Sequence, residues 1–219
     1  MTHDHEKASW TKAYEWIRDA IESGELEMGT PLPENLLARE IGVSRTPIRE
    51  ALRSLEQDGY VKIIPQKGAF VSEISLEDLK EIYDIRKLLE PFAALSAVNR
   101  IPEEEIDEME KGWKALKKAA LAGEVDLTRV SEMDLLLHLT ITKYATNKRI
   151  GAIITTYHAQ IKRFQKLSAQ SLSNIHETIG QHLEILEKLR ERDARGLSSL
   201  LYEHIAKSES NIMKDYFLK

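Results

Sequence analysis

Apolar positions follow helical spacing along almost the whole chain, with one short exception near residue 65. In the first part, this spacing predicts helices at residues 10–23, 34–41 and 44–57. Residues 60–64 and 69–74 are instead rich in β-forming side chains, and they flank the turn sequence PQKG. Three helices followed by a hairpin predict a winged helix-turn-helix.

After residue 75 the strand signal disappears and only helical spacing remains. We therefore expect a mainly α protein, with residues 1–74 forming the winged helix-turn-helix domain and residues 75–219 an all-α antiparallel bundle. Pro91 lies inside the first helical pattern of the bundle and predicts a kink there. The six predicted helices of the bundle span about 75–99, 102–123, 131–145, 148–167, 173–192 and 194–217.

The helix predicted at residues 44–57 carries arginines on one face and apolar side chains on the other. Arg45, Arg49 and Arg53 are four residues apart, so they project from nearly the same side. The opposite side can pack on the helix before it, across a turn at Gly42. A short helix held in this way, with a polar face left free, is what reading a DNA major groove requires.

The net charge of −5 argues against a nucleic-acid partner, but the distribution of charge weakens this objection. Between residues 39 and 67, six basic residues outnumber four acidic ones, and the arginines lie on one face. The chain has no cysteine, which excludes disulfides and thiolate metal ligands. No apolar run approaches the ~18 residues of a membrane span, and the polar N-terminus is not a secretory signal, so we expect a cytoplasmic protein with no membrane partner.

Three histidines and one aspartate in the second domain have a spacing typical of a metal site. Asp134 and His138 are four residues apart, so they share a helix face. His182 and His204 each lie eleven residues from Asp193, at the centre of the last helical connection. Two antiparallel helices would bring them to the same level, ~16 Å from the turn. Neutral imidazoles and a carboxylate suit Zn²⁺, Mn²⁺ or Ni²⁺. The alternative is a surface Asp–His pair with structural histidines elsewhere.

These motifs resemble a known family of bacterial regulators. The sequence SRTPIREAL at residues 44–52, with the later Gly68, is similar to the DNA-binding domain of GntR-family transcription regulators. The second domain resembles the FCD effector domain of the FadR-type branch. The resemblance there rests on Ile85-Arg86, Leu89-Glu90, Asp134-x-x-x-His138, Asn147, His182, Asp193 and His204.

The resemblance implies which residues contact DNA. Arg45, Thr46 and Arg49 match positions that read bases or phosphates, and Lys67 with Gly68 matches a wing tip that enters the minor groove. Arg53 either reaches phosphate or pairs with a neighbouring glutamate on its own helix. Asn35 departs from the family, because many members have arginine near this position, and this departure could alter operator preference.

The resemblance also implies the chemistry of the second domain. Asp134, His138, His182 and His204 match metal ligands, zinc being the default with nickel or manganese as alternatives, and a small carboxylate effector would complete the coordination. Arg86 matches a position near the pocket and could neutralise a second carboxylate, or it could pair with Glu90 one turn on. Such proteins act as homodimers on palindromic double-stranded operators.

We therefore expect a ligand-responsive DNA-binding transcription regulator, most often a repressor in this family, and not an enzyme. Two alternatives remain open from the sequence. The helical bundle could be a metal-dependent enzyme that activates water, although no second carboxylate or lysine is obviously placed as a general base. The chain could also be a DNA binder with no effector, whose histidines are structural.

Overall fold

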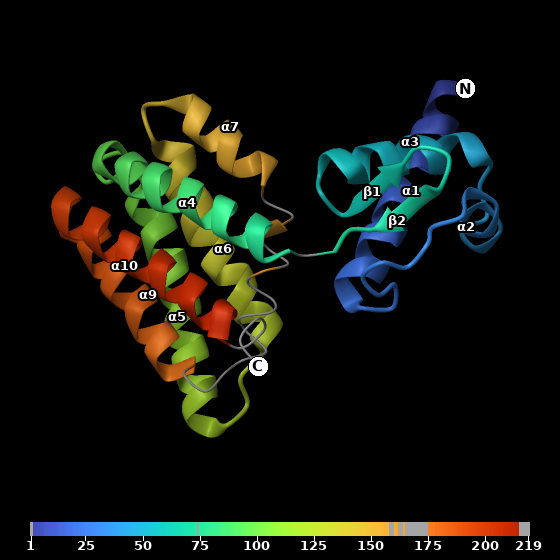
Figure 1. The fold of residues 1–219 in the computed structure, drawn as a ribbon. Helices are drawn as coiled ribbons and strands as arrows, with labels where there is room; N and C mark the ends of the chain where they lie inside the picture. Colours follow the sequence, from blue (N-terminus) through green and yellow to red (C-terminus); the bar gives the residue numbers. More distant parts are fainter. Residues whose placement is uncertain (1, 74, 158–159, 162–163, 165–174, 215–219) are drawn as a thin grey trace. The chain divides into compact units, whose positions relative to one another are not determined.

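The computed structural model describes residues 2–73, 75–157, 160–161, 164 and 175–214 (Figure 1). By its internal contacts the chain divides into two compact units, and the main division falls between Ser75 and Leu76. The predicted fold class, a winged helix-turn-helix followed by an all-α domain, is confirmed. Among the described helices, none has the length and apolar character needed to cross a membrane.

The first unit contains three helices and a two-stranded antiparallel sheet. α1 packs against α3 and α2, and α3 packs against β1, around one apolar core. α1 begins well before the predicted start at residue 10, because its first residues are polar and leave no apolar stripe in the sequence. The elements are α1 (Thr2–Ser23), α2 (Glu34–Ile41), α3 (Arg45–Gln57), β1 (Val61–Ile64) and β2 (Gly68–Val71).

The junction between α2 and α3 forms the helix-turn-helix. Gly42 ends α2 with a φ of 75°, a conformation that glycine adopts without strain, and its N–H donates to the carbonyl of Ala38. Ser44 is the N-cap residue of α3, and Pro47 is buried in the first turn, where its missing N–H costs nothing. Four apolar side chains on the inner face of α3 are almost completely buried, which leaves the arginine face outward; they are Ile48, Ala51, Leu52 and Leu55.

The hairpin after α3 is a wing with a tight turn. β1 and β2 pair antiparallel, with Ile64 opposite Gly68, and Gly68 has a φ of 101°. The segment at residues 29–33, which precedes α2, also pairs with β2. Leu32 donates its N–H to the carbonyl of Ala69 at 2.8 Å, and the N–H of Val71 donates to Thr30 at 2.9 Å. This third segment ties the wing to the start of α2.

Six helices make up the described part of the second unit. α4 runs continuously through Pro91. α6 begins four residues before the predicted position because the Asp126 carboxylate accepts hydrogen bonds from the N–H groups of Thr128 and Arg129. The end of the helix predicted at 148–167 lies mostly outside the described residues. The helices are α4 (Leu76–Ala97), α5 (Glu103–Ala122), α6 (Leu127–Tyr144), α7 (Lys148–Thr156), α9 (Ile175–Arg190) and α10 (Ala194–Ile212).

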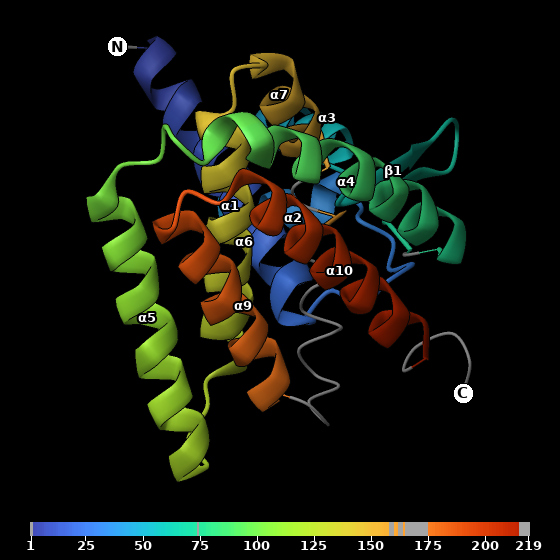
Figure 2. The same ribbon diagram turned by 90° about the vertical axis from the view of Figure 1, so that its left-hand side faces the viewer.

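Five of these helices form a closed ring. α4 packs against α10, α10 against α9, α9 against α5, α5 against α6, and α6 returns to α4. Figures 1 and 2 show this order, with α9 and α10 (orange and red) antiparallel and α4 (green) beside α10. The first and last of these five helices are therefore neighbours, and side chains from all five can meet in the interior of the ring.

Candidate metal centre and nucleic-acid interface

The predicted DNA-contacting residues lie on one exposed face of the first unit. The side chains of Arg45, Thr46, Arg49 and Arg53 are exposed on α3, and Lys67 with Gly68 is exposed on the wing. A depression of about 360 Å³ lies between these elements, and its lining includes Arg49, Arg53 and both wing residues. The structure therefore brings the helix and the wing together as a single concave surface.

Arg49 has a partner on this surface that the sequence did not reveal. Its Nε donates to Glu34 Oε1 at 2.9 Å, and its Nη2 donates to Glu34 Oε2 at 2.7 Å. The side chain of Arg53 is exposed, and it lines the same depression as the wing residues. Its role at the DNA stays a prediction.

The structure brings all four predicted metal ligands together inside the helical ring. One carboxylate oxygen, Oδ1 of Asp134, lies 2.7 Å from His182 Nε2, 3.1 Å from His204 Nε2 and 3.7 Å from His138 Nε2. The rings of His182 and His204 meet edge to face, with centroids 4.5 Å apart, as their equal distance from Asp193 predicted. Ligand atoms of Asp134, His138 and His204 all lie within 4.8 Å of one another.

The Nδ1 atom of each imidazole forms a hydrogen bond with an acceptor other than Asp134. His182 Nδ1 donates to the Thr178 carbonyl at 2.7 Å, and His204 Nδ1 bonds Gln181 Oε1 at 3.3 Å. His138 Nδ1 bonds the Glu90 carboxylate. With Nδ1 donating, the Nε2 atom of each ring turns toward Asp134, and only a proton or a cation between them makes this arrangement favourable.

The distances between the candidate ligand atoms in this cluster are close to those that separate the ligands of a bound metal ion. Ligands at about 2.1 Å from a tetrahedral Zn²⁺ are separated from one another by roughly 3.4 Å. The three distances from Asp134 Oδ1 to the imidazole nitrogens, 2.7 to 3.7 Å, bracket that separation. The donor set, its spacing and the outward hydrogen bonds of the imidazoles therefore all fit a divalent metal ion.

A buried ion pair supports the cluster from α4. Arg86 and Glu90 are each about 1% exposed, and Arg86 Nε donates to Glu90 Oε1 at 2.7 Å. Burial alone would raise the pKa of Glu90, yet the Arg86 guanidinium and His138 together lower it to about 2. Of the two predicted roles of Arg86, the pair with Glu90 is thus present. Its Nη1 atom is buried without a hydrogen-bond partner among the described residues, so the two N–H groups of that atom remain available.

Burial and the neighbouring charged groups shift the pKa values of His138 and His204 in opposite directions. Burial lowers the pKa of His138, but the Glu90 carboxylate outweighs it, and together with Asp134 raises the pKa to about 9. Burial and the neighbouring His182 lower the pKa of His204 to about 4, which keeps that imidazole neutral. A neutral imidazole is the form that binds a metal ion.

Sequence reasoning missed several residues that complete the centre. Glu90 was noticed as part of the family resemblance and as a partner for Arg86, but its bond to His138 was not predicted, because it joins residues that are distant in the chain. Trp113 was not singled out, although its ring stacks on His182 with centroids 3.8 Å apart. One signal was present in the sequence: Arg86 and Glu90 lie one turn apart on a helix whose other inward residues are apolar, which marks them as a buried pair.

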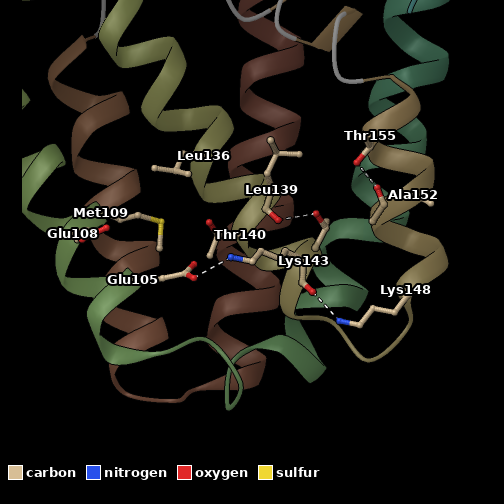
Figure 3. Close-up of a pocket in the computed structure, with 12 residues that line it drawn as sticks. Glu105, Glu108, Met109, Leu136, Leu139, Thr140, Lys143, Lys148, Ala152 and Thr155 are labelled. Carbon is tan, nitrogen blue, oxygen red and sulfur yellow. Dashed lines mark hydrogen bonds and ion pairs between the residues drawn. The ribbon is translucent and has the colours of Figure 1, made fainter. Parts of the chain in front are cut away.

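A separate groove lies on the outside of the bundle, between α5, α6 and α7 (Figure 3). Its volume is about 610 Å³, and its lining includes Leu136, Lys143 and Lys148 but none of the four predicted ligands. Lys143 donates to Glu105 at 3.0 Å, and Lys148 donates to the carbonyl of Lys143 at 2.8 Å. Both lysines and Glu105 thus have partners within the groove itself.

Comparison with known proteins agrees with both halves of this architecture. Residues 11–71 match the model of bacterial regulatory proteins of the gntR family, and residues 81–207 match the FCD domain. The chain belongs to the GntR family and carries an FCD domain. The resemblance noted from the sequence is therefore confirmed.

Relatives of this GntR-family chain are named as transcription regulators. It is 27% identical over 184 residues to the HTH-type transcriptional repressor RspR of Escherichia coli, covering 84% of this chain and 80% of RspR. It is 33% identical over 156 residues to the gluconate operon transcriptional repressor of Bacillus subtilis, covering 71% of this chain and 63% of that protein. These names indicate regulation of transcription rather than catalysis.

Solved structures share the GntR fold over nearly the full chain. Escherichia coli McbR/YncC superposes with a TM-score of 0.76 at 22% identity, covering 95% of this chain and 98% of that one. A GntR-type regulator from Rhodococcus sp. RHA1 gives a TM-score of 0.77, also at 22% identity, covering 95% and 99%. At this level of identity, the likeness concerns the fold alone.

Proposed function

We propose that this GntR-family protein is a metal-dependent, ligand-responsive repressor that works in the cytoplasm. Its FCD domain would hold a divalent ion, zinc by default, through Asp134, His138, His182 and His204. One observation carries the proposal: three imidazoles, each held at Nδ1, turn their Nε2 atoms toward a single carboxylate oxygen.

The effector that we propose is a small organic acid. A bound metal ion would supply an electrophilic centre that attracts a carboxylate. Arg86 adds a buried cation beside the cluster, and its unpartnered Nη1 atom is the donor available for a second acidic group. One relative is named for the gluconate operon, so gluconate is a reasonable first compound to test, together with other sugar acids and small dicarboxylates.

The active form in this proposal is a homodimer that binds a palindromic operator. α4 carries Leu88, Phe92 and Leu95 on its outer face, with exposed fractions of 73%, 60% and 44%. These side chains are spaced four and three residues apart, so they form one apolar stripe. A second copy of the chain would cover this stripe and supply the second recognition helix.

Regulation would pass from the metal centre through α4. This helix carries Arg86 and Glu90 on its inner face and the proposed dimer contact on its outer face, and it follows the wing strand β2 directly in the chain. An effector that binds two arrangements of the dimer with affinities differing by a few kcal/mol would be sufficient to release DNA.

The test begins with the purified full-length chain. We expect about one metal ion per chain by elemental mass spectrometry, and a His182→Ala variant should lose it. His176→Ala is the matched control, because His176 is an exposed histidine on the same helix. Selection from randomised duplexes should return a palindrome, and one of the acids should weaken binding of that duplex in a gel shift. A wild-type chain with no bound metal, or no acid that changes DNA binding, would refute the corresponding part of the proposal.

A further inference from the structure

Glu34 is a carboxylate placed among the arginines of the predicted DNA-reading face. It is the first residue of α2, and it forms a two-point ion pair with Arg49 on α3. The Arg49 hydrogen bond lowers the pKa of Glu34, opposed by slight burial, and the charges of Arg45 and Arg53 lower it further. The carboxylate therefore stays ionised, in contact with Arg49 and influenced by the charges of two further arginines.

This pair lies on the concave surface between the recognition helix and the wing. Glu34, Arg49, Lys67 and Gly68 all line the same depression. About 57% of the Arg49 side chain and 34% of that of Glu34 remain exposed, so the pair is open to a partner. A carboxylate on a surface that faces DNA repels the phosphates and therefore opposes binding. The presence of Glu34 here calls for a compensating benefit, and its contact with Arg49 suggests what that benefit is.

The geometry of the pair determines which edge of Arg49 is free. A guanidinium has five N–H groups arranged on two edges, one formed by Nε and Nη2 and the other by Nη1 and Nη2. Glu34 occupies the first edge, because its two oxygens bond Nε and Nη2. The second edge presents two parallel N–H donors, which match the O6 and N7 acceptors of guanine in the major groove.

We infer that Glu34 is a positioning residue that fixes Arg49 for two-point recognition of a guanine in the operator. The inference rests on the proposal that α3 reads DNA bases. With both oxygens engaged, Glu34 restricts rotation of the guanidinium plane about its long side chain, so less conformational entropy is lost when the guanine is bound. Without Glu34, Arg49 can turn toward a phosphate, which attracts it equally in every sequence.

The experiment compares sequence discrimination with general DNA affinity. Selection from randomised duplexes with the wild-type chain first defines the operator and its guanines. Fluorescence anisotropy then measures binding to that duplex, to duplexes in which each guanine pair is replaced in turn, and to a scrambled duplex. The variants are Glu34→Ala and Glu34→Gln, with Glu40→Gln as the control, since Glu40 is exposed on the same helix.

We expect Glu34→Ala to reduce discrimination at one guanine per half-site by about tenfold, the scale of one bidentate arginine–guanine contact. Binding to the scrambled duplex should stay the same or become tighter, because a negative charge has been removed. Glu34→Gln keeps one acceptor oxygen and should lie between the wild type and Glu34→Ala. Glu40→Gln should leave discrimination unchanged.

A double-mutant cycle with Arg49→Ala isolates the pair. In the Arg49→Ala background, removing Glu34 should no longer change discrimination at the same guanine. If Glu34→Ala instead tightens binding to all duplexes equally, Glu34 only repels phosphate and the inference is wrong. If the wild-type chain selects no sequence at all, the proposed DNA-reading function fails, and that result is distinct from a failure of the role of Glu34.

Discussion

Replacing Glu90 by alanine tests the buried ion pair that supports the candidate metal centre. Arg86 and Glu90 are about 1% exposed, so neither charge is compensated by water. Removing one partner of such a pair leaves an unpaired buried charge, which typically costs about 3–5 kcal/mol. At about 2–4 °C per kcal/mol for a domain of roughly this size, the melting temperature of the FCD domain should fall by about 6–20 °C.

The measurement is differential scanning calorimetry of metal-free protein in the presence of a chelator, so that metal binding does not contribute to the difference. The double variant Arg86→Met/Glu90→Met replaces both charges with apolar groups of similar length. It should recover most of the lost stability, because an ion pair replaced as a unit leaves no uncompensated charge.

Metal affinity separates the two roles of Glu90. Both variants lack the carboxylate that holds Nδ1 of His138, so both should bind Zn²⁺ about 10–100-fold more weakly in isothermal titration calorimetry. If the melting temperature of Glu90→Ala falls by less than about 3 °C, then the variant does not leave Arg86 as an unpaired buried charge, and the reasoning is wrong. A double variant that is both stable and normal in metal affinity would refute the support of His138 by Glu90.

Three further predictions concern other parts of the chain. Phe92→Glu should convert the proposed dimer to a monomer in analytical ultracentrifugation, because a charge would replace the centre of the apolar stripe on α4. Gly68→Ala should destabilise the winged domain by about 1–3 kcal/mol in urea unfolding, because a φ of 101° strains any residue with a side chain, although the space around it is open. Tyr60→Phe should reduce the loss of stability at alkaline pH. Burial and the hydrogen bond to Glu22 raise the pKa of Tyr60, so its contribution is complete below about pH 10, the unfolded value, and is lost as the pH rises further.

Two of these predictions have a matched control variant. Tyr202→Phe lies in the second unit and is half exposed, so it should leave the alkaline transition of the winged domain unchanged. Leu121→Glu places a charge on an exposed leucine away from α4 and should leave the dimer intact. A dimeric Phe92→Glu variant, an unchanged Gly68→Ala domain, or equal pH dependence in Tyr60→Phe and the wild type would each contradict the reasoning behind that prediction.

The sequence predicted best where the determining interactions are local. α2 and α3 were placed within one residue of their observed ends, since a glycine in a left-handed turn and an N-cap serine mark them. The meeting of His182 and His204 could also be predicted, because it depends only on helical rise and on the turn at Asp193.

The remaining features depend on contacts between distant segments. The bond from His138 to Glu90 and the stacking of Trp113 on His182 depend on the order of helices in the ring, which hydrophobic spacing does not determine. The pairing of residues 29–33 with β2, and the clamp of Glu34 on Arg49, likewise depend on how the wing and α2 pack. Spacing identifies which side of a helix is buried, but it does not identify the partner that this side meets.

The closure of the helical ring by α10 on α4 sets an order of events during protein synthesis. The winged domain precedes the ring in the chain, so it can fold while later helices are still within the ribosome. The FCD interior cannot close until α10 has emerged, because α10 carries His204 and covers α4. A translation product that stops before α10 would thus retain the winged domain while lacking the helix that carries His204 and covers α4.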